Sequence, residues 1–176
     1  MSADPIQRIS VVAGDITQQR VDAIVNAANS QLLPGGGVCG AIHRAAGPGL
    51  AQACREIGHC ASGDAVTTPG FNLAAGWVIH TVGPVWSGDS AGEADLLASS
   101  YGAVLREAGR VGAKSVAIPT ISAGIYGFPL DDACAIAVRA CVAALADSNV
   151  TEVRLVGFSE AARDAYRRAL VVEAHR

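Results

Sequence analysis

Short runs rich in valine, isoleucine and alanine alternate along the chain with longer segments of helical spacing, and this alternation is what most constrains the fold. Helical patterns begin near Val38, Gly49, Glu93, Asp131 and Ser159. Strands that alternate with helices predict one α/β domain, in which a mixed, mostly parallel sheet is covered by helices on both faces. The predicted strands are Ile9–Val12, Ala23–Val25, Ala65–Thr68, Trp77–Val82, Ser115–Pro119 and Glu152–Gly157.

The composition agrees with one packed domain over residues 1–176. Hydrophobic residues make up 51% of the chain and charged residues 16%, so a disordered chain is not expected. Few of the apolar residues are aromatic, which suits strands that are buried on both faces. Cys134 and Cys141 are seven positions apart in a helical pattern, and we expect both to be core residues.

Charge and cysteine content bear on partners and location. The net charge is −3, so a nucleic-acid-binding surface, which normally needs a basic patch, is not expected. The start MSADPIQRIS lacks the pattern of a signal peptide, and no apolar run reaches the roughly 18 residues of a membrane span. Five cysteines show no disulfide-like spacing. We therefore expect a cytoplasmic protein without membrane contact, compatible with a monomeric state.

Four loops follow the carboxyl ends of predicted strands, where open α/β sheets bind their ligands. Two are rich in glycine: Asn26–Cys39 runs into GGGVCG (Gly35–Gly40), and Pro119–Pro129 contains SAGIYG. A glycine loop that leads into a helix exposes backbone amides at the positive end of the helix dipole, where anions bind without basic side chains. Two such loops facing each other would hold a diphosphate, although each could also simply turn the chain. The other two loops are Gly14–Thr17 and Gly157–Ser159.

The glycines also match a dinucleotide-binding fingerprint, because Gly35, Gly37 and Gly40 have the spacing G-x-G-x-x-G. That fingerprint follows its strand immediately, whereas nine residues separate Val25 from Gly35 here. No strand with an acidic end follows about 20 residues later. A nicotinamide-dependent oxidoreductase is therefore a weaker alternative. A Walker loop is excluded because no Lys-Ser or Lys-Thr follows the glycines.

The order and spacing of five stretches resemble the macro domain family, and most of all its MacroD-type subgroup. The resemblance runs from about Ile9 to Tyr166, and implies a three-layer α/β/α sandwich that binds ADP-ribose. MacroD-type members commonly remove ADP-ribose from acidic side chains and deacetylate O-acetyl-ADP-ribose. The resemblance therefore implies a hydrolase whose partners are ADP-ribosylated proteins or O-acetyl-ADP-ribose, with no cofactor. The stretches are VVAGDIT, VDAIVNAAN, GGGVCGAIHRAAGP, VIHTVGPVW and IPTISAGIYGFPLDDA.

The resemblance assigns roles around the adenine. It implies that the Asp15 carboxylate accepts a hydrogen bond from the exocyclic amine, that the Ile16 amide pairs with the ring, and that Phe158 stacks on it. Asp15 could instead be a turn or N-cap residue, as aspartate often is. Phe158 could equally be a core residue.

The resemblance also assigns roles around the ribose and diphosphate. Asn29 would contact the distal ribose and Tyr126 would wall it, while we expect Asn26 only to tie the loop backbone together. Phe128 is either a neighbouring wall or packing. The diphosphate would be held mainly by amides of Gly36, Gly37, Val38, Ser122, Ala123, Gly124, Ile125 and Tyr126.

The histidines predict no metal site. His80 lies in an apolar strand and is expected to be a hydrogen-bonded interior residue, and a structural hydrogen bond is favoured over catalysis for His43. Cys54, His59 and Cys60 form C-x4-H-C, but a fourth ligand at zinc-like spacing is missing.

Cys39 departs from the MacroD-type pattern, which has an aspartate there that positions or activates the attacking water. Pro34 is a second departure, since another glycine is common at its position. Cys39 could be inert, leaving a non-enzymatic reader of ADP-ribose. It could be a thiolate nucleophile, because a helix N-terminus favours the thiolate, but His43 is then the only evident basic partner. In a third alternative the diphosphate of the substrate holds the water while Asn29 and Tyr126 position the distal ribose. We favour this third route, and Asn29, Cys39 and Tyr126 are the candidate catalytic residues.

Overall fold

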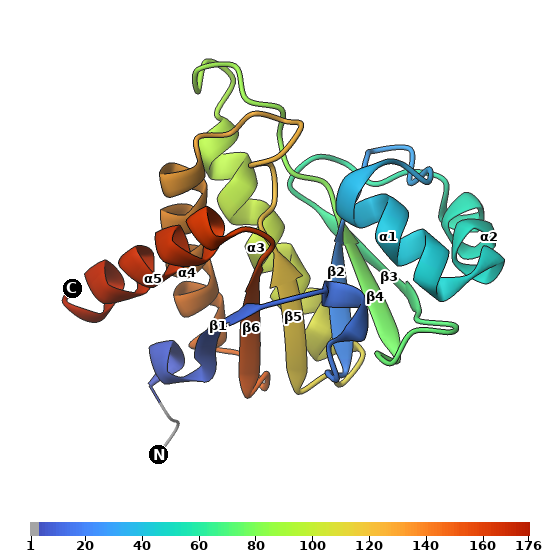
Figure 1. Ribbon diagram of the computed structural model, residues 1–176, viewed down its shortest axis with the longest axis horizontal. Helices are drawn as coiled ribbons and strands as arrows, with labels where there is room; N and C mark the ends of the chain where they lie inside the picture. Colours follow the sequence, from blue (N-terminus) through green and yellow to red (C-terminus); the bar gives the residue numbers. More distant parts are fainter. Residues whose placement is uncertain (1–3) are drawn as a thin grey trace.

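A computed structural model describes residues 4–176, which form one six-stranded sheet (Figure 1). The strand order is β1-β6-β5-β2-β4-β3, and every neighbouring pair is parallel except β3 with β4. The sheet is therefore mixed and mostly parallel, as predicted. The strands are β1 (Ile9–Ala13), β2 (Ala23–Ala27), β3 (Ala65–Pro69), β4 (Trp77–Thr81), β5 (Ser115–Pro119) and β6 (Glu152–Gly157).

Helices cover both faces of the sheet and make the predicted three-layer sandwich. Figure 1 shows α1 and α2 on one side and α3, α4 and α5 on the other. Each helix begins within one residue of its predicted start, and Ser159 is the N-cap of the last one, where its hydroxyl accepts from Ala162 N. The helices are α1 (Gly37–Ala46), α2 (Pro48–Ile57), α3 (Glu93–Arg110), α4 (Leu130–Leu145) and α5 (Glu160–Ala174), with short 3-10 helices η1 (Pro5–Arg8) and η2 (Ile16–Gln18).

Two hydrophobic cores lie on the two sides of the sheet because successive strand residues point to opposite faces. Val25 and Ile79 pack toward α3, α4 and α5, whereas Ile24 and Val78 pack toward α1 and α2. Cys134 and Cys141 are fully buried in the first core, as predicted, and burial raises the pKa of each thiol to about 12. The described part of the chain contains no disulfide, and all five cysteines are buried. Within residues 4–176, no helix is long and apolar enough to cross a membrane.

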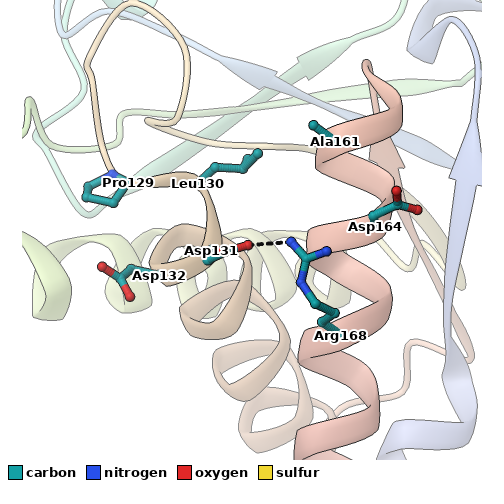
Figure 2. Close-up of a pocket in the computed structure, with 7 residues that line it drawn as sticks. All are labelled: Pro129, Leu130, Asp131, Asp132, Ala161, Asp164 and Arg168. Atoms are coloured by element: carbon teal, nitrogen blue, oxygen red, sulfur yellow. Dashed lines mark hydrogen bonds and ion pairs between the residues drawn. The ribbon is translucent and has the colours of Figure 1, made fainter.

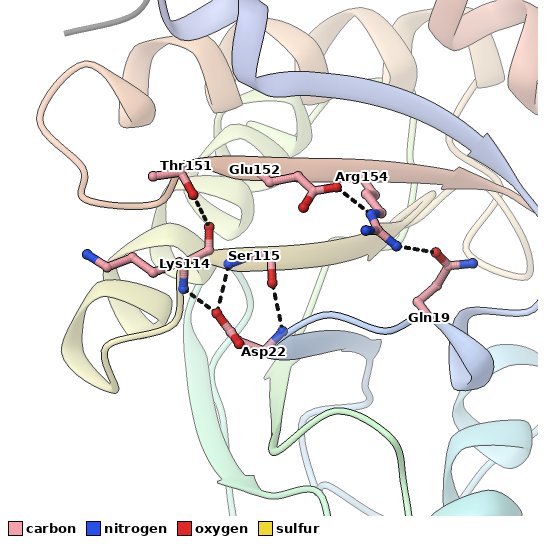
Figure 3. A network of polar contacts seen from close by, with 7 residues as sticks. All are labelled: Gln19, Asp22, Lys114, Ser115, Thr151, Glu152 and Arg154. Carbon is pink, nitrogen blue, oxygen red and sulfur yellow. Dashed lines mark hydrogen bonds and ion pairs between the residues drawn. The ribbon is translucent and has the colours of Figure 1, made fainter.

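Strands β2 and β5 pair only near their amino ends. Their ladder covers two residue pairs, whereas β2–β4 and β5–β6 each cover five. Side chains reinforce the amino ends: the Asp22 carboxylate accepts from Lys114 N (2.7 Å) and Ser115 N (3.1 Å), and Ser115 Oγ accepts from Asp22 N at 2.9 Å (Figure 3). Beyond this clamp the chain leaves β2 for α1 on one face and leaves β5 for α4 on the other. Divergent connections of this kind mark the ligand-binding edge of an α/β sheet.

Candidate ligand-binding site

The four predicted loops lie at one edge of the sheet, because β1, β6, β5 and β2 are neighbours and run parallel. In Figure 1 the segment before α1 and the loop after β5 both lie at the upper edge. Helix η2, which follows β1, packs against α1, the helix into which the glycine loop leads. The segments that carry Asp15 and Phe158 leave the sheet at adjacent positions, since β1 ends at Ala13 and β6 at Gly157, and these two residues pair in register.

The loop after β1 is held by Asp15. Its Oδ1 accepts from Thr17 N (2.9 Å) and Thr17 Oγ1 (2.7 Å), so the alternative that Asp15 caps a short helix is confirmed. The residue is exposed and its carboxylate has further acceptor capacity, so its predicted contact with an adenine amine stays a prediction. The Ile16 side chain is buried in the core under α1 and α2, and only its backbone is left for a ligand.

Asn29, and not Asn26, ties the glycine loop together. Asn29 Nδ2 donates to Leu33 O at 2.8 Å, and Asn29 Oδ1 accepts from Leu33 N at 3.0 Å. The prediction that Asn26 has this role is wrong, because β2 continues to Ala27 and turns the Asn26 side chain into the interior, where it is 1% exposed. The distal-ribose role of Asn29 stays a prediction.

Helix α1 begins with exposed backbone amides. Gly36 is its N-cap, without a side-chain capping bond, and Gly37 has a φ of 57°, which L side chains rarely adopt. A Cβ added to either glycine would meet nothing within 4 Å, so the space beside them is open. A Cβ at Gly40 would instead lie 2.5 Å from Gly35 O, because the loop lies directly on the helix. Val38 is half-buried in this first turn, whose free N–H groups suit an anion.

The loop after β5 is held against residues 84–86. Ser122 has a φ of 66°, its Oγ donates to Pro84 O at 2.8 Å, and Tyr126 O accepts from Trp86 N at 2.8 Å. Between these anchors Ala123 is half-buried, while Gly124 and Ile125 are exposed, Ile125 to 90%. The Tyr126 side chain is half-buried.

The two candidate phenylalanines differ. Phe128 is buried, with its ring 4.5 Å from that of Trp86, so the packing interpretation of Phe128 is confirmed. Phe158 is 91% exposed, so the alternative that it is a core residue is wrong. An exposed aromatic ring at the end of β6 is available to stack on a planar ligand.

Cys39 is 6% exposed and lies between the loop and β2. Its Sγ is 3.8 Å from Leu33 O and 3.7 Å from Asn26 Nδ2. Among the described residues no hydrogen bond joins Cys39 to His43, whose Nδ1 is buried without a partner and whose pKa is lowered by burial. The structural bond expected of His43 is therefore not made through Nδ1. His80 is the interior residue that we predicted, with Nε2 2.9 Å from Thr68 Oγ1.

With this geometry in hand, comparison with known proteins decides the family. The model of the macro domain family matches residues 25–137. The chain belongs to the macro domain family. A macro domain-containing protein of Chlorobaculum tepidum is 52% identical over 163 residues, which are 92% of this chain and 95% of that protein. A Klebsiella pneumoniae protein named O-acetyl-ADP-ribose deacetylase is 50% identical over 165 residues, 91% of this chain and 94% of that one.

Solved structures agree with the family. A mutant Oceanobacillus iheyensis macrodomain with ADPR superimposes with a TM-score of 0.91 at 38% identity, over 96% of this chain and 94% of that one. The strand order of this macro domain also differs from the order 3-2-1-4-5-6 of a dinucleotide-binding Rossmann fold.

A hollow of about 660 Å³ lies between the first turn of α4 and residues 161–168 of α5 in this macro domain (Figure 2). An ion pair crosses it, with Arg168 Nη2 2.7 Å from Asp131 Oδ1. None of the predicted site residues lines it. The lining residues are Pro129, Leu130, Asp131, Asp132, Ala161, Asp164 and Arg168.

The sequence interpretation of this macro domain missed two sets of contacts. Pro84 and Trp86 anchor the loop after β5, and the Asn26 side chain joins Cys39 to His80. Pro84, Trp86 and His80 all lie in the stretch VIHTVGPVW, which was a usable signal for the loop anchors. Nothing local could have paired Asn26 with Cys39, because that contact depends on where β2 ends.

Proposed function

We propose that this macro domain binds ADP-ribose along the carboxyl edge of β1, β6, β5 and β2. The observation that carries the proposal is the pair of glycine loops after two adjacent parallel strands, each with exposed residues and one leading into an uncapped helix N-terminus. Exposed Phe158, which follows β6 where that strand pairs with the end of β1, supports an adenine site at this end of the edge. The Oceanobacillus iheyensis macrodomain solved with ADPR supports the choice of ligand.

The proposed reaction is hydrolysis of ADP-ribosyl esters, either on glutamate or aspartate of proteins or in O-acetyl-ADP-ribose. Water attacks with the help of the diphosphate of the substrate, while Asn29 and Tyr126 position the distal ribose. Asn29 keeps one N–H and one lone pair beyond its two bonds to Leu33, enough for ribose hydroxyls. The deacetylase name of the Klebsiella pneumoniae relative supports this class of reaction.

A second candidate function is a reader that binds ADP-ribose without hydrolysing it. The observation that favours the reader is the buried thiol of Cys39, which lies between the Leu33 carbonyl and the Asn26 amide. A thiol in this position cannot act as a general base in the way that a carboxylate can. The two candidates share the binding site and differ only in turnover.

Release of ADP-ribose from a glutamate-linked mono-ADP-ribosylated protein separates the two candidates. The native chain and Cys39→Asp are compared under single-turnover conditions, with ADP-ribose affinity measured by calorimetry. We expect the native chain to release ADP-ribose well above the enzyme-free control, and Cys39→Asp to be faster by up to about 10²–10⁴-fold if it supplies a general base. Tight binding without native release would make the protein a reader. No binding by the native chain would refute both candidates.

The cellular setting is a further part of the proposal. We place the protein in the cytoplasm, where five buried thiols stay reduced, and treat it as a monomer in the experiments below.

A further inference from the structure

A chain of buried polar side chains crosses the sheet from β3 to the start of α1. Thr68 on β3 is joined to His80 Nε2 at 2.9 Å, His80 Nδ1 to Asn26 Nδ2 at 3.1 Å, and Asn26 Nδ2 to Cys39 Sγ at 3.7 Å. All four side chains are buried. Buried polar chains of this kind orient their members strongly, because each lost bond leaves an unpaired group.

The hydrogen bonds along this chain run in one direction. The Asn26 amide group donates one N–H to His80 Nδ1 and turns the other toward Cys39 Sγ. Because Nδ1 accepts, Nε2 carries the proton of the neutral ring and donates to Thr68 Oγ1, with Cys54 Sγ a more distant neighbour at 3.8 Å. Burial lowers the pKa of His80 to about 4, so the ring stays neutral near pH 7. In this orientation Asn26 Oδ1 is buried without a hydrogen-bond partner among the described residues.

The thiol of Cys39 therefore has a hydrogen-bond donor, the Asn26 amide, on one side and an acceptor, the Leu33 carbonyl, on the other. Its sulfur accepts from Asn26 Nδ2, and its S–H donates to Leu33 O, 3.8 Å away. Leu33 is also the residue that Asn29 holds through both backbone groups. The thiol thus connects β2 to the loop that leads into α1.

We infer that Cys39 is a positioning residue whose thiol holds the glycine loop in its binding conformation, and that Thr68 and His80 orient it through Asn26. The inference rests on the proposed function, since that function makes this loop a diphosphate site. Position 39 here suits a group that both donates and accepts. Cysteine and serine meet this requirement, whereas alanine does not.

Calorimetric titration with ADP-ribose tests the inference. Removing a thiol bond of this kind should weaken binding about three- to tenfold in Cys39→Ala, while Cys39→Ser keeps most of the native affinity. Thr68→Val removes the hydroxyl partner of His80 Nε2 and leaves only the Cys54 thiol, 3.8 Å from that nitrogen. The ring and the Asn26 amide are then held less firmly, and the thiol of Cys39 can move away from Leu33. We expect a similar loss in Thr68→Val and no further loss in Cys39→Ala/Thr68→Val.

Thr67→Val is the matched control for this cycle. Thr67 is the neighbouring β3 residue, and its hydroxyl donates to Glu107 instead of joining the buried chain. The affinity of the Thr67→Val protein for ADP-ribose should stay within about twofold of the native value. Additive losses in the double variant, or a Cys39→Ser protein as weak as Cys39→Ala, would overturn the inference.

Amide hydrogen exchange of the ligand-free protein separates this inference from the proposed function. Cys39→Ala and Thr68→Val should speed exchange in residues 33–40, whereas Cys39→Ser and Thr67→Val should not. If the native chain fails to bind ADP-ribose but shows this exchange pattern, the proposed function fails and the positioning role stands. If it binds ADP-ribose and Cys39→Ala changes neither affinity nor exchange, only the positioning role fails.

Discussion

At this site some side chains are exposed to solvent, and others are already hydrogen-bonded to the loop backbone. The side chains of Phe158 and Ile125 are almost fully exposed to solvent, so their apolar surfaces remain available to contact a ligand. Asp15, Asn29 and Cys39 already hold loop backbone through hydrogen bonds. These three residues therefore affect ligand binding partly by holding backbone amides in place. Substituting one of them changes both the order of its loop and any contact that it makes with the ligand.

Phe158→Ala tests the adenine site without a stability penalty. Base-to-aromatic stacking contributes about 1–3 kcal/mol, so ADP-ribose affinity should fall about 5- to 160-fold. The thermal midpoint should change little, because an exposed ring contributes little to the core. Val172→Ala, another exposed apolar residue but at the end of α5, is the control and should leave affinity unchanged. Equal affinity of Phe158→Ala and the native chain in calorimetry would remove Phe158 from the site.

Strand and helix ends decide the geometry at the scale of elements. The short β2–β5 ladder and the Asp22 clamp hold the amino ends of these strands together, while the loops that follow them run to opposite faces. The first of these loops then lies directly on α1, with Gly35 O against Gly40. The glycine at position 40 is therefore a packing requirement, separate from any contact with a ligand.

Gly40→Ala tests this packing. The added Cβ would meet Gly35 O at 2.5 Å, so the loop must move, and overpacking of this kind should cost about 1–3 kcal/mol in the free energy of unfolding. Gly109→Ala is the matched control, since its Cβ in α3 would meet nothing within 4 Å. It should be neutral or stabilise by up to about 1 kcal/mol through helix propensity. Urea unfolding measures both, and equal stability of the two variants would contradict the close contact.

The whole molecule places its proposed chemistry at one edge of the sheet and its structural clamps at the other. Figure 3 shows the amino-end network, and Figure 1 shows the loops at the opposite edge. Between them the sheet is buried by the two cores, and the polar chain through His80 passes inside it. A charge that develops on this buried chain therefore lowers the stability of the whole domain.

Acidification should destabilise the fold through His80. Burial lowers its pKa from 6.5 to about 4, so the unfolded chain binds a proton more readily than the folded one. The contribution is complete above about pH 6.5 and is lost as the pH falls to about 4, amounting to roughly 3 kcal/mol. Burial also lowers the pKa of His43, which adds to the same slope.

Urea unfolding at pH 7.5 and pH 4.5 measures this slope, and NMR titration reports the pKa of His80 in the native protein. His80→Gln should flatten the slope, whereas the exposed control His59→Gln should not. A His80 that titrates near 6.5 in the folded state would contradict the prediction.

What the sequence determined by itself is local or periodic: the strands, the helix starts, the two glycine loops and the edge on which they meet. These follow from apolar spacing, from glycine and from the parallel alternation of elements, which need no knowledge of distant partners. Only the tertiary structure decided that Asn29 holds the loop, that Asn26 faces His80 and Cys39, and that Phe158 is exposed. The physical reason is that these contacts and exposures depend on which strands become neighbours. They also depend on β2 running to Ala27, two residues beyond its predicted end, because this extension turns the Asn26 side chain into the interior.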